Sequence, residues 1–361
     1  MQNRAIIDQT RPDQTRPDQT RPDHDHPIVR NSSLELLRIV AMLMIIAHHF
    51  SVHGGFSFPA NSIAINRLWT QFIHMGGSLG NNIFVMLSGY FLIKSTNINL
   101  RRLLALGLKM SFWSAVISGI FLLFLPGITL PAFLKNALPT QWWFASAYFV
   151  MYLIHPYVNR LLRSFSREEY RKFLLSVMVY WCVIPTLTRS NFGANSTINF
   201  VCLYSLAGYV RLYPEDFGTR KFILWGALFA GGNFLSVIAL DVLDSAQSYF
   251  TLHPYYFLEM MRPFTIAAAL CLLVGFTKLN IHHSRVINTL ASATFGVYLI
   301  HEHPFVRPFL WHEVFRNASF QNSPYLIPYS VAVVLIVYTV CTLLELLRSR
   351  IFQALSRGKL M

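Results

Sequence analysis

Apolar runs of about twenty residues recur along most of this chain, and that is the length an α-helix needs to cross the hydrocarbon core of a bilayer. Only 13% of the 361 residues are charged, while 54% are hydrophobic and the mean hydropathy is +0.42. A soluble protein carries roughly twice that charged fraction. The sequence therefore predicts an all-α, polytopic integral membrane protein that lies in a lipid bilayer.

Basic loops alternate with loops poor in Lys and Arg, and this pattern predicts about ten transmembrane helices. The predicted spans are residues 34–53, 72–93, 103–125, 142–159, 173–188, 198–210, 222–240, 259–277, 287–303 and 324–347. Lys and Arg concentrate in the loops that stay in the cytoplasm. Because both ends of the chain are basic, we expect both termini in the cytoplasm and the protein in the inner (plasma) membrane. Pro263 and Pro304 mark positions where a helix is expected to break.

Three parts follow from this pattern. Residues 1–33 repeat DQTRP three times and cannot build a hydrophobic face, so they are expected to be a disordered cytoplasmic tail. Residues 34–350 form the membrane domain, and residues 351–361 form a basic cytoplasmic tail. No cleaved signal peptide is expected, because the first apolar run begins only after residue 33 and is long enough to stay in the membrane.

The charge distribution argues against a nucleic-acid-binding protein, and the cysteine spacing argues against a disulfide or metal framework. The net charge of +14 would suit a nucleic-acid partner, but its distribution over alternate loops is explained by membrane topology. We therefore expect no nucleic-acid binding. The four cysteines lie in apolar spans at no ligand spacing, so they are expected to be buried hydrophobic residues without a disulfide or metal role.

The first predicted span carries Glu35, Arg38, His48 and His49. Ionisable side chains inside a span are costly and normally face the protein interior or a wet cavity. Arg38 and His49 are eleven residues apart, about 1100° around a helix, so they lie within about 20° of one stripe and about 16 Å apart along it. Glu35 is one turn before Arg38 and can pair with it. His48 lies about 80° off the stripe.

The stripe connects a candidate anion site with a candidate general base. Arg38, Arg101 and Arg102 are expected near the cytoplasmic face, where guanidinium groups suit phosphates. His49 is expected near the opposite face, where a histidine suits proton transfer. The alternative is structural: Arg38 and Glu35 would form an interfacial ion pair, and His49 would cap the helix at the outer surface.

Further polar residues are candidates for substrate contact. Asn82, in the glycine-rich second span, can line a polar cavity, and His48 lies beside the general-base candidate. His301, at the outer end of the ninth span, is expected to face the same cavity as His49. His53, at the edge of the first span, is expected to be interfacial.

The His301-Glu302-His303 triplet raises the question of a metal. Histidine and carboxylate side chains are common metal ligands. Alternate residues on a helix point about 200° apart, however, and no further ligand motif supports the triplet. The sequence therefore predicts no metal site.

Four stretches resemble the membrane-bound acyltransferase-3 family, whose members O-acylate cell-surface carbohydrates. They are ELLRIVAMLMIIAHH, with its Arg-x10-His spacing, IFVMLSGYFLI, WWFASAYFVMYLIHP and SATFGVYLIHEHP, in this order. Together with the ten-span hydropathy, the likeness covers residues 30–350. The resemblance implies that acyl-CoA arrives from the cytoplasm and that a hydroxyl on the far side of the membrane accepts the acyl group.

The resemblance also implies roles for particular residues. Arg38 and His49 match the motif pair of the family, and the Arg101-Arg102 pair matches a basic cluster after the second span. The sequence departs from the family at Asn81-Asn82, where relatives often have an acidic residue.

The expected function is an O-acyltransferase. It would move an acyl group, and most simply the acetyl group of acetyl-CoA, to a surface polysaccharide, lipopolysaccharide or lipid-linked glycan. The expected catalytic residues are His49, Arg38 and Glu35; the expected acyl-CoA ligands are Arg101, Arg102 and Arg38; the expected substrate contacts are His48, Asn82 and His301. A transporter or flippase is the alternative, but the second half holds no copy of the ELLR…HH motif. A catalytically silent membrane scaffold is a third possibility.

Overall fold

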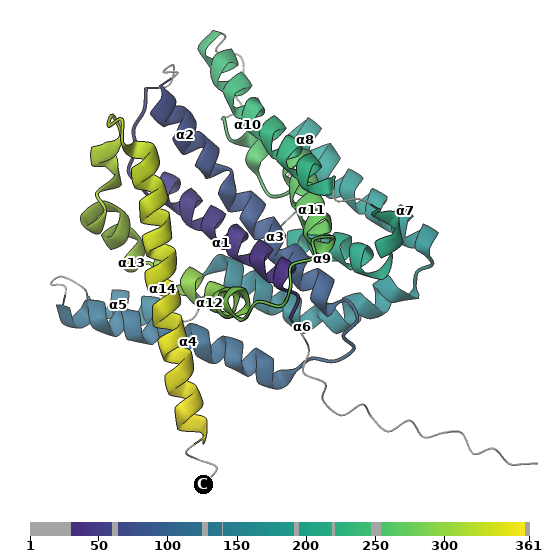
Figure 1. Cartoon of the computed structure of the whole chain (residues 1–361), viewed down its shortest axis with the longest axis horizontal. Coiled ribbons are helices and arrows are strands. Elements are labelled where there is room, and N and C mark those ends of the chain that lie inside the picture. The colour runs from purple at the N-terminus through teal and green to yellow at the C-terminus, as the bar shows by residue number, and fades with distance from the viewer. Residues whose placement is uncertain are drawn as a thin grey trace, which may run out of the picture. The chain divides into compact units, whose positions relative to one another are not determined.

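The computed structural model describes residues 30–59, 64–124, 129–138, 140–190, 195–218, 221–246 and 254–357. The chain divides into two units, Met1–Arg30 and Asn31–Met361. The second unit contains the described helices, and no strand occurs among the described residues (Figure 1). Residues 1–29 of the predicted tail lie outside the described ranges, and the first helix already begins at Ser32.

The α-helices lie close to the predicted spans. They are α1 Ser32–Val52, α2 Ile65–His74, α3 Gly76–Leu92, α4 Leu100–Phe124, α5 Leu130–Ala137, α6 Trp143–Ser164, α7 Arg167–Met178, α8 Ile184–Thr188, α9 Ser196–Leu212, α10 Phe222–Ala246, α11 Pro263–Thr277, α12 Arg285–His301, α13 Val306–Pro308 and α14 Leu326–Arg357. Shorter π and 3₁₀ segments connect several of them. Each predicted span coincides with a helix or with consecutive helical segments.

Among the described residues, five helical segments are long and apolar enough to cross a bilayer. They are Ser32–Val52, Leu100–Phe124, Phe222–Leu243, Tyr256–Thr277 and Leu326–Leu355. The prediction of an all-helical membrane protein is thereby confirmed, whereas the count of ten spans stays a prediction.

Prolines set two helix boundaries, as the sequence predicts. Pro263 is the first residue of α11, where its missing N–H costs no helical hydrogen bond. Helix α12 ends at His301, before Pro304. At the other end of the chain α14 continues to Arg357, past the predicted start of the tail at residue 351.

Glycines let α3 pack closely between α1 and α9. A Cβ on Gly76 would lie 2.4 Å from the carbonyl oxygen of Met44 in α1, and one on Gly89 would lie 2.5 Å from the carbonyl oxygen of Tyr204 in α9. Such approaches exclude any larger residue. The three helices run side by side in Figure 1, and the close packing fixes the position of α1, which carries the ionisable stripe.

Helices α1 and α12 lie side by side and run in the same direction. Near their N-termini the Ser32 hydroxyl donates to the side chain of Asn288 at 3.1 Å. Near their C-termini His49 contacts His301 at 2.9 Å. Because polar contacts join both ends, the register of the two helices is fixed, and the polar C-terminal residues of each face the other.

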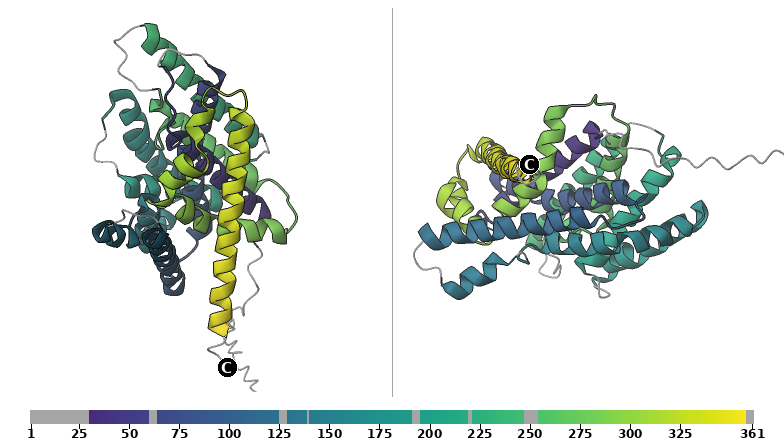
Figure 2. Two further views of the ribbon diagram at one scale, coloured as in Figure 1. Left: turned by 90° about the vertical axis from the view of Figure 1, so that its left-hand side faces the viewer. Right: turned by 90° about the horizontal axis from the view of Figure 1, so that it is seen from below.

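A buried carboxylate connects α14 to α4. Glu345, which is 2% exposed, accepts hydrogen bonds from Trp113 Nε1 at 2.8 Å and from the Arg348 guanidinium at 2.7 and 2.8 Å. Lys109 Nζ lies 2.8 Å from the same carboxylate. This network attaches α4, whose first turn carries the predicted phosphate ligands, to the long helix α14, drawn in yellow in Figure 2.

Candidate active site

His49 is held by a second histidine. Its Nδ1 lies 2.9 Å from Nε2 of His301, and Nδ1 of His301 lies 2.6 Å from the carbonyl oxygen of Val297. A carbonyl only accepts, so Nδ1 of His301 carries the hydrogen and Nε2 of the neutral ring accepts from His49 Nδ1–H. The Nε2 atom of His49 is then unprotonated, which is the state a general base requires.

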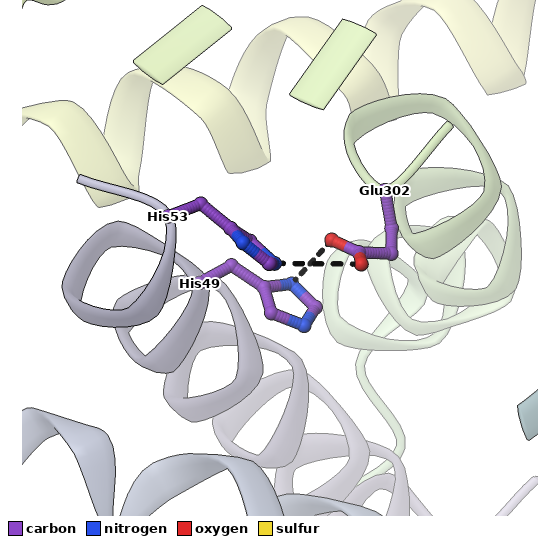
Figure 3. Close-up of side chains that lie close together, drawn as sticks. All are labelled: His49, His53 and Glu302. Carbon is purple, nitrogen blue, oxygen red and sulfur yellow. Dashed lines mark ion pairs between the residues drawn. The ribbon is translucent and has the colours of Figure 1, made fainter. Parts of the chain in front are cut away.

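Glu302 stands at the centre of a cluster at this end of α1. Its carboxylate lies 3.2 Å from His49 Nδ1, 3.6 Å from His53 Nε2 and 3.2 Å from the Arg307 guanidinium. The side chains of His49 and Glu302 are only 13% and 12% exposed. Figure 3 shows His49 and His53 directed to the two carboxylate oxygens, with the second ring nitrogen of His49 pointing away. The carboxylate therefore orients His49 together with His301.

Sequence reasoning missed three members of this cluster. His53 was expected at the membrane interface, but it contacts Glu302 inside the cluster. Its spacing of four residues from His49 puts both rings on one helix face, and that was the available signal. Glu302 was considered only as a metal ligand, and nothing in the sequence marked Arg307.

The His301-Glu302-His303 triplet divides as its spacing requires. His301 and Glu302 face His49, whereas His303 packs against Trp142, with the two ring centroids 5.7 Å apart. His303 Nε2 lies 3.4 Å from the Ser118 hydroxyl. The triplet therefore does not act as one ligand set.

A different trio has the spacing of a metal site. One ligand atom each from His49, His53 and Glu302 lie within 4.8 Å of one another. Two histidines and a carboxylate are a common ligand set. Two of these three side chains, however, already have partners: His301 accepts from His49 Nδ1, and Arg307 pairs with the Glu302 carboxylate. The expectation of no metal stays a prediction.

A cavity of about 460 Å³ adjoins the cluster. Its lining residues are Val52, His53, Gly55, Pro304, Arg307, Pro308 and His312. His53 and Arg307 both line the cavity and both contact Glu302. His312 Nε2 donates to the carbonyl oxygen of His53 at 2.7 Å and so holds the wall together. The cavity can admit a polar substrate beside the histidine cluster.

A second cavity, of about 220 Å³, lies at the Arg38 end of α1. Arg38 and Arg102 both line it, and Arg38 Nη1 pairs with the Glu35 carboxylate at 2.9 Å, as the sequence predicts. Glu35 is buried, so the pair fixes the arginine side chain. Arg101 is exposed and is not among the lining residues. The structure thus brings together two of the three predicted arginines.

Three other residues of this second cavity were not predicted as site residues, although they lie in stretches that resemble the family. Ser88 from α3 and Tyr148 and Tyr152 from α6 contribute hydroxyl-bearing side chains to its wall. Each appears in an apolar helical segment, where a lone hydroxyl is unremarkable. Only the packing of α3, α4 and α6 around α1 collects them.

Two predicted substrate contacts lie elsewhere. His48 Nδ1 is 2.6 Å from the carbonyl oxygen of His74, and its ring packs against Gly77 of α3. Asn82 is fully buried and donates to the carbonyl oxygen of Met260 at 2.7 Å. Neither lines the two cavities described above, and their contacts join α1 and α3 to neighbouring segments.

A family model described as an acyltransferase domain, Acyl_transf_3, matches residues 31–345. Curated proteins and solved structures yield no match. The matched region begins just before α1 and ends within α14, so it includes the histidine cluster and both cavities.

Proposed function

This chain belongs to the acyltransferase-3 family, and from that premise we propose that it transfers an acetyl group from acetyl-CoA to a hydroxyl of an extracytoplasmic carbohydrate or glycolipid. The family makes the protein a membrane acyltransferase. The proposed transfer from acetyl-CoA to a hydroxyl is supported by the arrangement of polar side chains along α1. One continuous helix has an arginine-lined cavity at one end and an oriented histidine at the other.

The donor site is the cavity at the Arg38 end. Arg38 and Arg102 provide guanidinium groups for the phosphates of CoA. Tyr148 and Tyr152 continue the wall along α6 toward its N-terminus at Trp143. From Tyr152 to Trp143 the helix rises about 14 Å, similar to the axial distance from Arg38 to His49. The pantetheine arm can therefore span the bundle along α1 and α6.

His49 is the general base. In the neutral tautomer, its Nε2 takes the proton of the acceptor hydroxyl while Glu302 stabilises the imidazolium that forms. The acceptor enters through the cavity lined by His53 and Arg307. On this scheme Arg38 and Glu35 bind and orient the donor and do not take part in proton transfer.

Donor and acceptor are proposed to come from opposite sides of the membrane. The topology behind this proposal predicts that a reporter fused after residue 165 is cytoplasmic and that one fused near residue 195 is exported. The basic loop around residue 165 supplies the physical reason. Alkaline phosphatase and green fluorescent protein fusions measure the two positions. Reversed locations would overturn the assigned sides of both cavities.

The function itself is tested by comparing surface glycans from cells with and without the gene. Mass spectrometry should detect acetyl esters that disappear with the gene and return with the plasmid-borne wild type. Membrane vesicles should transfer label from [¹⁴C]acetyl-CoA to the same glycans, with and without EDTA. Loss of glycan export with unchanged acetylation would instead identify a transporter, and loss of transfer in EDTA would assign the His49–His53–Glu302 trio to a metal.

A further inference from the structure

We propose that the N-terminus of α6, the Tyr298 hydroxyl and the Trp142 indole together bind the carbonyl oxygen of the acyl thioester and stabilise its oxyanion. This inference rests on the proposed function. It assigns residues to the binding of the thioester carbonyl, whereas the histidine cluster provides only the general base.

The first observation is a buried helix start without a side-chain cap. Trp142 occupies the N-cap position, and its side chain makes no capping hydrogen bond. The first helical bond runs from the Ser146 amide to the Trp142 carbonyl oxygen at 3.0 Å. The amides of residues 143–145 precede that bond and have no acceptor within the helix. Phe144 is 7% and Ala145 0% exposed, whereas Trp143 is 49% exposed, so the positive end of the helix is buried on the side of Phe144 and Ala145.

The second observation is a pair of buried donors without acceptors. Tyr298 is 6% exposed and Trp142 is 1% exposed. Neither the Tyr298 hydroxyl nor Trp142 Nε1 donates a hydrogen bond to any described residue. The Tyr298 oxygen faces the backbone amide of Phe144, and the two rings lie 5.8 Å apart. Leaving such donors unpaired costs about 1–3 kcal/mol each, so a ligand that accepts from them gains affinity.

These donors gather on the same end of the bundle as the general base. Tyr298 is one helical turn before His301 on α12, and their ring centroids are 6.3 Å apart. His301 in turn contacts His49. Trp142 packs against His303, two residues after His301. Tyr298 thus adjoins the histidine that contacts His49.

An oxyanion is the ligand that fits this set. It accepts several hydrogen bonds, it carries negative charge, and the amides at a helix N-terminus favour such a charge. On the proposed path, the pantetheine arm runs along α6 from Tyr152 and Tyr148, which line the donor cavity, and its thioester lies at the helix N-terminus. A cation would meet the positive end of the helix and the indole N–H here, and both disfavour it.

The proposed reaction is an addition to the thioester carbonyl followed by elimination of the thiolate. His49 Nε2 takes the proton from the acceptor hydroxyl, and the oxygen forms a bond to the thioester carbonyl carbon. The C=O π electrons move onto the oxygen, which accepts hydrogen bonds from Tyr298, Trp142 and the amides of Trp143 and Ala145, because the Phe144 amide faces the Tyr298 oxygen. Collapse of this intermediate breaks the C–S bond. The thiolate takes the proton from the His49 imidazolium, giving CoA and an O-acetyl ester.

Tyr298→Phe tests the inference, because it removes one donor and keeps the ring. The variant is expressed in a strain that lacks the wild-type gene, and membrane vesicles of this strain contain the natural acceptor. In these vesicles we expect kcat to fall by about 10²- to 10³-fold with little change in the KM for acetyl-CoA. Trp142→Phe should show the same pattern. Tyr338→Phe is the matched control, since it also removes a buried hydroxyl, here one that donates to the Leu290 carbonyl at 3.4 Å outside the site. Its kcat should stay at the wild-type value.

Two binding measurements separate an oxyanion site from a packing role. The ¹³C resonance of bound [1-¹³C]acetyl-CoA should move toward its value in aprotic solvent in Tyr298→Phe, because the carbonyl loses a donor. Binding of S-ethyl-CoA, a thioether without a carbonyl, should be unchanged in the same variant. A wild-type kcat in both Tyr298→Phe and Trp142→Phe would overturn the inference. It would also be overturned if Tyr298→Phe lost affinity for S-ethyl-CoA as strongly as for acetyl-CoA. Absence of acetyl transfer by the wild type would instead refute the proposed function.

Discussion

Replacing His49 with asparagine is expected to reduce glycan acetylation by about 10²-fold or more, while protein level and membrane insertion stay unchanged. Asparagine can still donate to His301 and Glu302 through its amide, so the cluster keeps a partner at this position. It has no basic nitrogen, and the acceptor hydroxyl therefore keeps its proton. Mass spectrometry of acetyl esters on the surface glycan, normalised to an immunoblot of the membrane fraction, measures the effect.

His48→Asn is the matched control. The neighbouring histidine contacts the His74 carbonyl and faces α3, away from the Glu302 cluster, so its replacement should have the milder effect. Normal acetylation by His49→Asn would show that the histidine is structural. A complete loss in His48→Asn alone would transfer the role of base to the adjacent residue and invalidate the tautomer argument.

Removing the arginines of the donor cavity is expected to raise the KM for acetyl-CoA. Arg102→Ala removes one charge-assisted hydrogen bond, worth about 1.5 kcal/mol or about tenfold in KM, because water screens an exposed side chain. Combining it with Arg38→Gln, which keeps an amide to donate to Glu35, should raise the KM by about 10²-fold. The KM for the glycan should change little. Initial rates of label transfer in vesicles at varied acetyl-CoA concentration measure both constants.

Arg101→Ala is the matched control for Arg102→Ala, because it tests whether lining the cavity matters. Arg101 has the same charge as Arg102 and directly precedes it in the sequence, but it does not line the cavity. We therefore expect a near wild-type KM for acetyl-CoA. An effect of Arg101→Ala as large as that of Arg102→Ala would mean that the cluster acts through its net charge at the membrane face. An unchanged KM in the Arg38→Gln/Arg102→Ala variant would rule out the donor site.

Much of the fold follows from local sequence. Apolar length and proline position determine where the helices begin and end, because both act through the backbone of the same segment. Helical spacing likewise predicts the Glu35–Arg38 pair and the opposite directions of His301 and His303. The Arg-x10-His spacing on α1 also resembles the family motif, and it depends on the sequence of one helix alone.

The assembly of the site was decided by tertiary structure alone. Glu302, which pairs with Arg307, reaches His49 from a segment about 250 residues away, and only the parallel pairing of α1 and α12 brings them together. Among the adjacent arginines, the packing of α3, α4 and α6 around α1 selects Arg102 for the cavity wall. The unpaired donors of Tyr298 and Trp142 have no sequence signature, because an unmet hydrogen bond is a property of what surrounds a group. Periodicity specifies the face on which a side chain lies, but the packing of distant helices determines what it meets there.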